Sequence, residues 1–330
     1  MGGKLGKLYQ LVTNYPDERI GWTPYAFMKG RNLLRQWVPE VILASGPPFT
    51  TLLIAYLISR VSKLPLVIEF RDRWSNDPYY PPPRWRRYWD RWLENKIVAH
   101  AAGLITVSEP WAKAYRQSFK KPTEVIFNGF DADSNEGDRF ADTTNPEVLS
   151  IVYTGGIYPD RRDPSPLFEA ISDCERSGRK ICVSFYGTNE QHVIPLAEKF
   201  GIRHLVHVKP SVTHAEAVQL QRQADILLLM QWNNPKEQGN VPGKFFEYLG
   251  ALRPILVLGL KDGVPASIVK ERDAGFFSNS PKEISEQLEM WCRTKQESGR
   301  IAALPEEARR GFSRNDQFAK LVPFLRTVLQ

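Results

Sequence analysis

The segment "VPGKFFEYLGALRPILVLG", residues 241–259, joins a short helix to a short buried strand. Its second half, 254–258, is an uninterrupted apolar run, which predicts a buried strand. Its first half, opened by Pro-Gly and closed by Gly, predicts a helix. Lys244 and Glu247 stand three residues apart and therefore share one face of that helix. Either they form an ordinary surface ion pair, or the helix directs both of them at a ligand.

Apolar strands and helical segments alternate along the rest of the chain. Further helices are expected over 48–63, 84–99 and 164–177, and after Glu109 and Thr213. This alternation, with short connections, argues for parallel sheets that are covered by helices on both faces. The other expected strands are 39–45, 65–72, 102–108, 123–131, 148–156, 180–187, 204–210 and 224–230.

The predicted strands and helices fall into two runs, separated by a polar stretch rich in Asp, Asn and Thr. The fold class is therefore α/β, with two Rossmann-like, doubly wound domains. We expect domains over 1–130 and 131–312, and a C-terminal helix over 313–330 that packs back toward the first domain. A doubly wound domain usually opens with a strand and a Gly-rich turn. Neither precedes residue 39, so the first domain is expected to be incomplete.

The composition is that of a soluble globular protein of 330 residues, with 42% hydrophobic and 25% charged residues. The formal net charge of +7 favours phosphorylated ligands or an anionic membrane surface, and it is too small for a nucleic-acid-binding signature. Cys174, Cys182 and Cys292 lack metal-binding spacing and are expected to be reduced, packed thiols. No metal site and no nucleic-acid partner are expected.

The first ten residues, "MGGKLGKLYQ", lack the apolar region of a secretory signal. Gly6 stands where a myristoylation motif has Ser or Thr. The most hydrophobic window, 41–61, is interrupted by "GPP" at 46–48, which predicts a strand, a turn and a helix rather than a membrane span. A cytoplasmic protein is therefore expected.

Several motifs together resemble the GT-B glycosyltransferases, specifically family 4 of the retaining enzymes. They are "LITVS", "VIFNGFD", "IVYTGGIY", "ADILLLM" and "VPGKFFEYLGALRPIL", in that order, and the resemblance runs from about residue 17 to the end. "YPDERIGW", "SGPPFT" and "FRDRWSNDP" are similar to the subgroup that makes bacterial surface polysaccharides. The resemblance implies two domains facing across a cleft, with a sugar nucleotide on the second and an acceptor on the first. It also implies no metal and no cofactor.

The resemblance assigns Glu247 to the ribose of the donor. An ionised carboxylate can accept hydrogen bonds from a vicinal diol, and negative charge is favoured near a helix N-terminus. The alternative is a carboxylate that only stabilises the helix or an ion pair. The family's second glutamate, eight residues earlier, is Gly239 here. Glu237, Gln238 or the backbone amides of 239–243 are candidates to replace it.

The resemblance also places cations on the donor diphosphate. Arg161 and Arg162 follow the first strand of the second domain, where the family has a basic residue, and an arginine fork binds two phosphate oxygens at once. We favour Arg162, with Lys244 as a further catalytic contact; a solvated arginine pair is the alternative for the loop. The remaining predicted donor contacts lie at strand ends and at the helix start: Gly155, Gly156, Gly243 and Val212.

On the acceptor side, "EFRDRW" ends a strand and brings Arg71 and Asp72 to its carboxyl end. Asp72 stands where many relatives have His, and a carboxylate there can orient or deprotonate an acceptor hydroxyl. A capping or ion-pair role is the alternative. Gly46 and Pro47 form a rigid turn at another strand end and are expected to line the same cleft.

The segment 84–99 interleaves arginines with Trp85, Trp89 and Trp92 at helical spacing. Such a stripe favours a helix whose aromatic face packs into the core. The alternative is an interfacial helix with Trp at headgroup depth and Arg on anionic lipid. A lipid-linked acceptor would give such a helix a purpose.

These features predict a retaining glycosyltransferase that moves a hexose from a nucleoside-diphosphate sugar to a saccharide or lipid-linked acceptor. Its expected role is in cell-surface polysaccharide or glycolipid biosynthesis. A catalytically inactive sugar-nucleotide-binding module and a nucleotide-sugar 2-epimerase are the alternatives.

Overall fold

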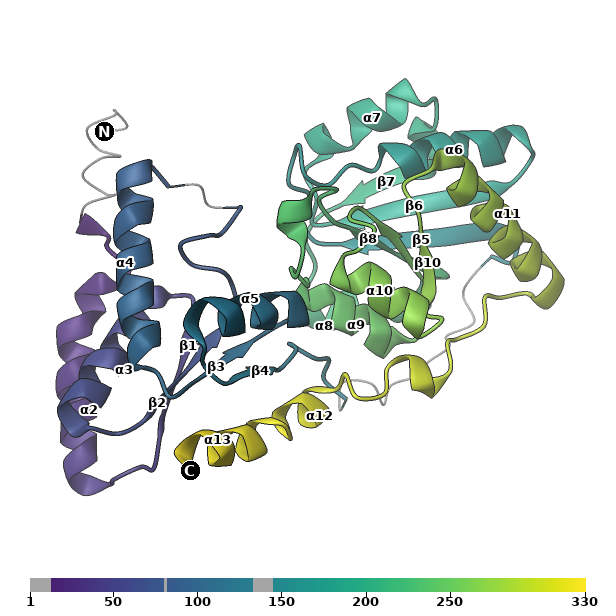
Figure 1. The fold of residues 1–330 in the computed structure, drawn as a ribbon. Coiled ribbons are helices and arrows are strands. Elements are labelled where there is room, and N and C mark those ends of the chain that lie inside the picture. The colour runs from purple at the N-terminus through teal and green to yellow at the C-terminus, as the bar shows by residue number, and fades with distance from the viewer. Residues whose placement is uncertain (1–12, 80–81, 133–144) are drawn as a thin grey trace. The chain divides into compact units, whose positions relative to one another are not determined.

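The computed structural model describes residues 13–79, 82–132 and 145–330 and divides into two compact units. Unit 1 comprises 1–127 and 318–330, and unit 2 comprises 128–317. Each unit contains one parallel sheet flanked by helices, so the predicted α/β class with two parallel sheets is confirmed (Figure 1). The expectations for the first ten residues and for most of the polar linker fall on 1–12 and 133–144, outside the described residues.

The sheet of unit 1 has four parallel strands in the order β1-β2-β3-β4. Gly46 is in register with Phe70, and Phe70 with Thr106, so the strands finish at one common edge. The fourth strand is much shorter than the expected 123–131. The strands are β1 (Ile42–Gly46), β2 (Leu66–Phe70), β3 (Gly103–Thr106) and β4 (Thr123–Val125).

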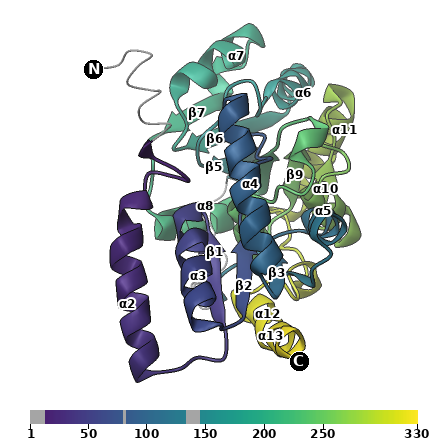
Figure 2. The same cartoon turned by 60° about the vertical axis from the view of Figure 1, so that its left-hand side comes forward.

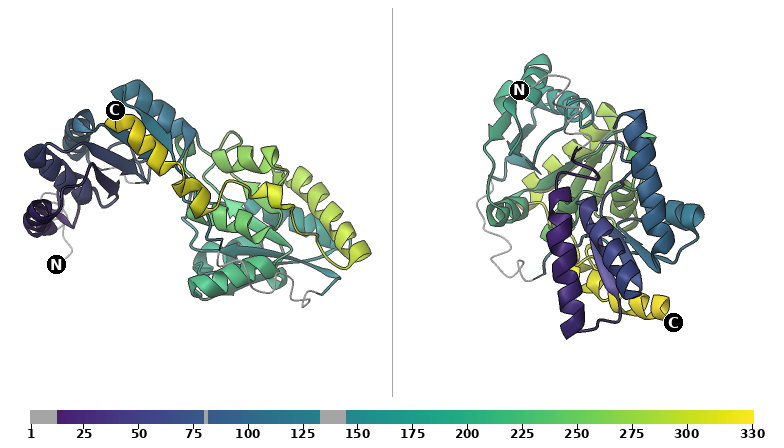
Figure 3. Two further views of the ribbon diagram at one scale, coloured as in Figure 1. Left: turned by 90° about the horizontal axis from the view of Figure 1, so that it is seen from below. Right: turned by 90° about the vertical axis from the view of Figure 1, so that its left-hand side faces the viewer.

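Helices cover both faces of this sheet. On one face α3 (Phe49–Ser62), α4 (Arg84–His100) and α5 (Glu109–Phe119) form the main core with the strands. On the other face α13 (Leu321–Leu329) packs over the sheet, where its Phe324 meets Val67 and Ile105 (Figure 3). The segment 318–330 is therefore an integral part of unit 1.

A helix that the sequence patterns did not predict, α2 (Thr23–Gln36), packs alongside α3 (Figure 2). The two helices approach closely at Gly30, where a Cβ atom would lie 2.5 Å from Cδ1 of Ile58. The short helix η1 (Ile20–Trp22) precedes it. Glycine at this crossing is what allows α2 to contact α3.

The sheet of unit 2 has six parallel strands in the order β10-β9-β8-β5-β6-β7. The chain enters at β5, extends to one side through β6 and β7, and then crosses to the other side through β8. Ligands of open α/β sheets bind outside the carboxyl ends of the strands at such a switch point. The strands are β5 (Val148–Thr154), β6 (Lys180–Tyr186), β7 (Val206–Lys209), β8 (Ile226–Met230), β9 (Ile255–Leu258) and β10 (Gly275–Phe277).

Alternate residues of the central strands separate two layers of helices in unit 2. Ile151, Leu228 and Leu256 belong to the core beneath α6 (Ser165–Arg176) and α11 (Pro281–Ser298). On the switch-point side, α8 (His214–Gln223) contacts both β5 and α9 (Gly243–Ala251). The remaining helices are η3 (Glu190–His192), α7 (Ile194–Lys199), η4 (Arg203–Leu205), η5 (Pro235–Glu237), α10 (Val264–Glu271), η6 (Glu306–Ala308) and α12 (Arg314–Phe318).

Two expectations about buried groups have different outcomes. The three cysteines are free, and Cys174 and Cys292 are buried, as expected for reduced, packed thiols. The expectation that the Trp stripe of α4 faces the core is wrong. Trp85, Trp89 and Trp92 are 41%, 49% and 46% exposed.

The burial of Arg86 explains why the tryptophans of α4 are exposed. Its guanidinium bonds Asp90 at 3.2 Å and donates to the carbonyls of Asn14 and Pro16 at 3.1 and 2.6 Å. The inner face of α4 therefore carries Arg86, Asp90 and the apolar residues one and two turns later, and the tryptophans occupy the opposite face. No described helix is long and apolar enough to cross a membrane, and 41–61 forms β1 and α3 as predicted.

Candidate functional site

Lys244 and Glu247 share a face of α9, but the structure forms no ion pair between them. Nζ of Lys244 instead donates to the carbonyl of Thr154, the last residue of β5, at 2.7 Å. The same ammonium lies 3.9 Å from the centre of the Tyr153 ring. A Cβ on Gly155 would come within 3.1 Å of it. The ordinary ion-pair interpretation is therefore wrong, and α9 directs its lysine to the switch point.

The surroundings of Lys244 disfavour its charged form. Burial lowers the pKa of its ammonium group to about 7, and the positive charge of Arg162 acts in the same direction, while Glu247 opposes both. A ligand that brought negative charge beside this ammonium would reverse the shift, because an opposite charge favours the protonated form. The position is therefore suited to an anion.

Arg162 is held at the same strand end. Its Nη1 donates to the carbonyl of Gly156 at 3.0 Å and to the hydroxyl of Tyr153 at 3.3 Å. Its guanidinium lies 4.6 Å from the centre of the Tyr158 ring. Its Nε is buried and has no hydrogen-bond partner among the described residues. The solvated-loop interpretation is wrong for Arg162, which retains a donor for an incoming acceptor.

The backbone at Gly155 and Gly156 leaves open space at the carboxyl end of β5. Gly155 has φ of +108°, a conformation that favours glycine, and its carbonyl accepts from the Thr188 hydroxyl at 2.8 Å. Apart from its chain neighbours, no atom of the described residues lies within 4 Å of where a Cβ on Gly156 would be, so the space beside it is open. Arg161 stacks on Trp232 with 5.0 Å between its guanidinium carbon and the ring centre.

Glu247 is oriented by two side chains of α8. Its Oε2 accepts from Nε2 of Gln221 at 3.2 Å, and its Oε1 lies 3.8 Å from Nδ1 of His214. Gln221 is fully buried and also donates to the hydroxyl of Thr154 at 3.1 Å. Because the Glu247 side chain remains 26% exposed, the fixed carboxylate can still accept hydrogen bonds from a ligand.

The contacts of His214, Gln221 and Tyr248 were missed by the sequence analysis. Tyr248 bonds the backbone N–H of Thr154 at 3.2 Å and so anchors α9 to β5. One available signal was "THAE", 213–216, which forms a capping box and starts α8 directly after β7. That signal places His214 in the first turn, but the pairing of Gln221 with Glu247 depends on how the helices pack.

Three other residues of unit 2 that the sequence singled out differ in their surroundings. Gly243 is the first residue of α9, and Val212 is half-buried in the loop before α8. Glu237, one candidate to replace the family's second glutamate, is 1% exposed and accepts from the Asn240 side chain at 3.0 Å. The Glu237 side chain is therefore buried and held by a hydrogen bond within the fold.

The opposite end of β5 is held by a different lysine. Lys295 of α11 is fully buried and donates to the carbonyl of Val148 at 2.7 Å. The same ammonium forms a 2.6 Å ion pair with Asp225, which also accepts from the backbone N–H of Ser150 at 2.8 Å. This lysine has a carboxylate partner, and its role is structural.

In unit 1, Arg71, Asp72 and Gly46 come together at the carboxyl edge of the sheet. The backbone N–H of Arg71 donates to the carbonyl of Gly46 at 3.0 Å, and Pro47 follows directly. Partial burial raises the pKa of Asp72, the charge of Asp77 adds to this shift, and Arg71 opposes it. Within the described residues the Asp72 carboxylate makes no hydrogen bond or ion pair, so the structure provides no capping or ion-pair role for it.

Each group of predicted residues is thus gathered within its own unit, the donor-side residues in unit 2 and the acceptor-side residues in unit 1. Across the described ranges, no group of three or more His, Cys, Asp or Glu side chains is arranged to hold a metal ion.

Residues 6–134 match the family model described as Glycosyltransferase Family 4. Solved structures resemble nearly the whole chain. Anabaena HepE, in complex with UDP and glucose, is 16% identical with a TM-score of 0.65, covering 99% of this chain and 84% of its own. The sucrose-phosphate synthase of Thermosynechococcus elongatus is 12% identical with a TM-score of 0.63, covering 94% and 79%.

The lipopolysaccharide outer core galactosyltransferase WaaB, in its apo form, is 12% identical with a TM-score of 0.59, covering 92% of this chain and 78% of its own. No curated protein matches the chain. The structural likeness confirms the GT-B fold expected from the sequence, and the family match confirms the expected enzyme class, a glycosyltransferase.

Proposed function

We propose that this protein transfers a hexose from a nucleoside-diphosphate sugar to a saccharide or lipid-linked acceptor, with retention at the anomeric carbon. Its role is in the biosynthesis of cell-surface polysaccharide or glycolipid. The observation that carries the proposal is the gathering of Lys244, Arg162 and Glu247 around the carboxyl end of β5. The donor then binds to unit 2 and the acceptor to unit 1.

The donor diphosphate lies beside Lys244 and the unpartnered Nε of Arg162, with the N-terminus of α9 at Gly243 supplying backbone N–H groups. Gly155 lets the phosphates approach the backbone closely. The two cations stabilise the negative charge that develops on the departing diphosphate, which is the largest catalytic contribution such a site can make. Glu247, oriented by Gln221, accepts hydrogen bonds from the ribose hydroxyls.

Asp72 serves the acceptor. Its raised pKa brings the carboxyl group closer to neutrality, which suits a group that orients an acceptor hydroxyl and takes its proton. Arg71 and the turn at Gly46 and Pro47 border the same sheet edge and position the acceptor chain.

The exposed aromatic face of α4 supports a lipid-linked acceptor at the cytoplasmic face of a membrane. Trp85, Trp89 and Trp92 are exposed, and Arg84 and Arg87 lie on the exposed surface of the same helix. Tryptophan is favoured at headgroup depth, and each basic residue near an anionic surface contributes about 1 kcal/mol. Replacing Arg84 and Arg87 by Gln should therefore lower association with anionic vesicles about thirtyfold and leave nucleotide affinity unchanged. Unchanged vesicle association would contradict the membrane assignment.

Titration with UDP, GDP, ADP and TDP tests the donor site. We expect one nucleotide to bind preferentially and Glu247→Ala to weaken it at least about tenfold, since a charged hydrogen-bond acceptor is lost. Glu271→Ala, an exposed glutamate on α10, is the matched control and should leave the affinity unchanged. Equal nucleotide affinity in wild type and Glu247→Ala would show that the ribose does not bind at Glu247.

Turnover of the preferred sugar nucleotide separates the proposal from its alternatives. Release of nucleoside diphosphate with retained anomeric configuration supports a transferase. Binding without any turnover would identify an inactive module, and an inverted C2 centre without diphosphate release would identify an epimerase.

A further inference from the structure

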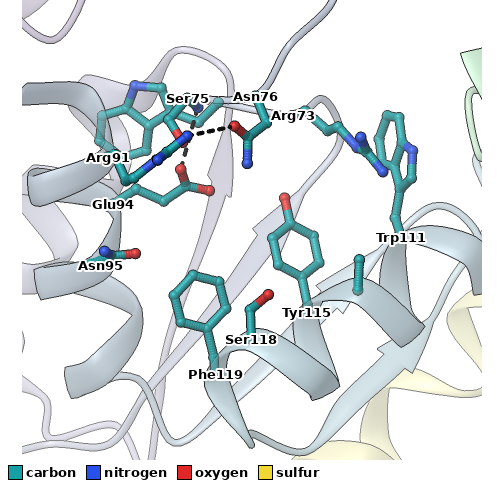
Figure 4. Close-up of a pocket in the computed structure, with 12 residues that line it drawn as sticks. Arg73, Ser75, Asn76, Arg91, Glu94, Asn95, Trp111, Tyr115, Ser118 and Phe119 are labelled. Atoms are coloured by element: carbon teal, nitrogen blue, oxygen red, sulfur yellow. Dashed lines mark hydrogen bonds between the residues drawn. The ribbon is translucent and has the colours of Figure 1, made fainter. Parts of the chain in front are cut away.

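Unit 1 contains a pocket of about 470 Å³ that none of the residues assigned so far lines. It lies between α4 and α5 and is closed at one end by the loop 73–76, which follows β2 and Asp72 (Figure 4). The pocket is therefore built entirely within unit 1, close to the carboxyl edge of its sheet.

One wall of the pocket is aromatic. Trp111, Tyr115 and Phe119 stand one turn apart along α5 and present their rings to the cavity. The Tyr115 ring is fixed by stacking on Phe70, with 5.0 Å between the ring centres. Flat aromatic faces of this kind pack well against the apolar face of a ring-shaped ligand.

The hydroxyl of Tyr115 is directed into the pocket. The residue is only 8% exposed, and its hydroxyl makes no hydrogen bond to any described residue. Figure 4 shows it pointing into the cavity, toward the side of Arg73 and Asn76. Burial raises the pKa of Tyr115 well above its usual value, and the charges of Glu94 and Asp72 act in the same direction. The hydroxyl therefore stays protonated, and Asp72 lies near enough for its charge to act on it.

The rest of the pocket lining is polar and carries excess positive charge. Glu94 is 6% exposed, accepts from the backbone N–H of Ser75 at 3.3 Å, and has its pKa raised by burial. Arg91 donates to the Asn76 side chain at 3.2 Å, and Arg73 lies 5.3 Å from the centre of the Trp111 ring. Neither arginine forms an ion pair with a described residue.

We infer that this pocket binds the acceptor, and that the sugar it holds carries a carboxylate, as in a uronic acid. The inference rests on the proposed function, because it names the acceptor of that reaction. The aromatic wall packs against the sugar ring, and Tyr115 and the Asn76 and Asn95 amides bond its hydroxyls. Arg73 and Arg91 bind the carboxylate, for which a planar guanidinium fork is suited. Asp72, next to this loop, then meets the hydroxyl that receives the transferred hexose.

Three matched pairs of methyl glycosides test the inference: glucuronide with glucoside, galacturonide with galactoside, and mannuronide with mannoside. Binding is followed by tryptophan fluorescence, since Trp74 and Trp111 line the pocket, and by saturation-transfer NMR. In at least one pair the uronide should bind about tenfold more tightly than its neutral parent, because a charged hydrogen bond is added. Equal affinity for the uronide and its neutral parent in every pair would contradict the proposal that the bound sugar carries a carboxylate. Displacement of the uronide by inorganic phosphate at equal concentration would contradict the proposal that the ligand is a saccharide.

Variants locate the binding. Arg91→Ala and Tyr115→Phe should each weaken uronide binding about fivefold to tenfold. The matched controls are Arg35→Ala on α2 and Tyr88→Phe on α4, exposed residues outside the pocket, which should have no effect. Equal affinity in Arg91→Ala and Arg35→Ala would place the ligand elsewhere.

Nucleotide affinity, measured on the same samples, distinguishes the two proposals. Uronide binding without any nucleotide binding would support an acidic-sugar site in this pocket and would reject the proposed glycosyl transfer. Nucleotide binding with no response to any uronide would reject the pocket as an acceptor site and leave the donor site intact.

Discussion

Two lysines hold the two ends of β5, and they differ in what surrounds them. Lys295 binds the carbonyl of Val148 at one end and is paired with Asp225. Lys244 binds the carbonyl of Thr154 at the other end and has no carboxylate partner among the described residues. A buried ammonium that is paired and hydrogen-bonded is neutralised within the fold, whereas an unpaired one leaves its charge available to a ligand. The comparison separates the structural end of the sheet from its functional end.

Removing the paired lysine should have the largest effect. Lys295→Ala leaves the carboxylate of Asp225 buried without its cation, so we expect the free energy of unfolding to fall by about 3–5 kcal/mol. Lys244→Ala should cost less than about 1 kcal/mol, because no buried countercharge is stranded. Urea unfolding of both variants, followed by circular dichroism, measures the difference. Similar losses of stability in the two variants would contradict the assignment of a structural role to Lys295 and a ligand-binding role to Lys244.

The second prediction concerns Arg162, the other cation at the functional end. Arg162→Ala should weaken binding of the preferred nucleoside diphosphate about tenfold to thirtyfold, because a charged hydrogen bond to phosphate is lost. Binding of the corresponding nucleoside should be unchanged. Isothermal titration with both ligands makes the measurement, and Arg179→Ala, away from this strand end, is the control. An equal loss for nucleoside and diphosphate would reject the phosphate role.

The pH dependence of binding, taken per pH unit, is the smallest expected effect. The pKa of Lys244 is depressed to about 7, so in the free protein this group loses its charge as the pH rises above 7. A bound diphosphate raises that pKa, so binding takes up a proton, and affinity should fall by up to about tenfold per pH unit above pH 7. Titrations between pH 6 and 9 test this. Lys244→Arg, which stays charged, should remove this lysine's share of the slope, and an unchanged slope would assign the proton to another group.

The same shift has a definite sign for stability. The pKa of Lys244 is lower in the folded protein than the usual value of 10.5, so the unfolded chain binds more protons between about pH 7 and pH 10.5. The contribution of this group to stability therefore increases as the pH rises through that range. A protein that places an ammonium here is less stable near neutrality than it would be without the charge, and a bound anion offsets this cost.

The regular parts of the fold were predictable because their signals are local. The apolar run 254–258 and its counterparts formed strands near the expected positions, and Thr213 caps α8 as its capping box indicates. The helix α2 was missed because it has no buried residue, and its place depends on contact with α3 at Gly30. No pattern within 23–36 carries that information.

The errors at the sites have a similar cause, since each depends on contacts between distant segments. The tryptophans of α4 are exposed because Arg86 reaches the carbonyls of Asn14 and Pro16, some seventy residues away in the chain. Spacing in the sequence correctly put Lys244 and Glu247 on one face of α9. Only the packing of α8 and β5 against that face determines that each side chain contacts a different partner.

The placement of α13 has a consequence for synthesis on the ribosome. Val67 and Ile105 lie beneath Phe324, so one face of the unit 1 sheet is covered by a helix that is translated only after all of unit 2. During translation this apolar face stays exposed while the 190 residues of unit 2, 128–317, emerge and fold as a continuous segment. Unit 1 can therefore complete its folding only after unit 2 has been synthesised. We therefore expect the nascent chain to be most prone to aggregation in that interval, when the sheet exists and its covering helix does not.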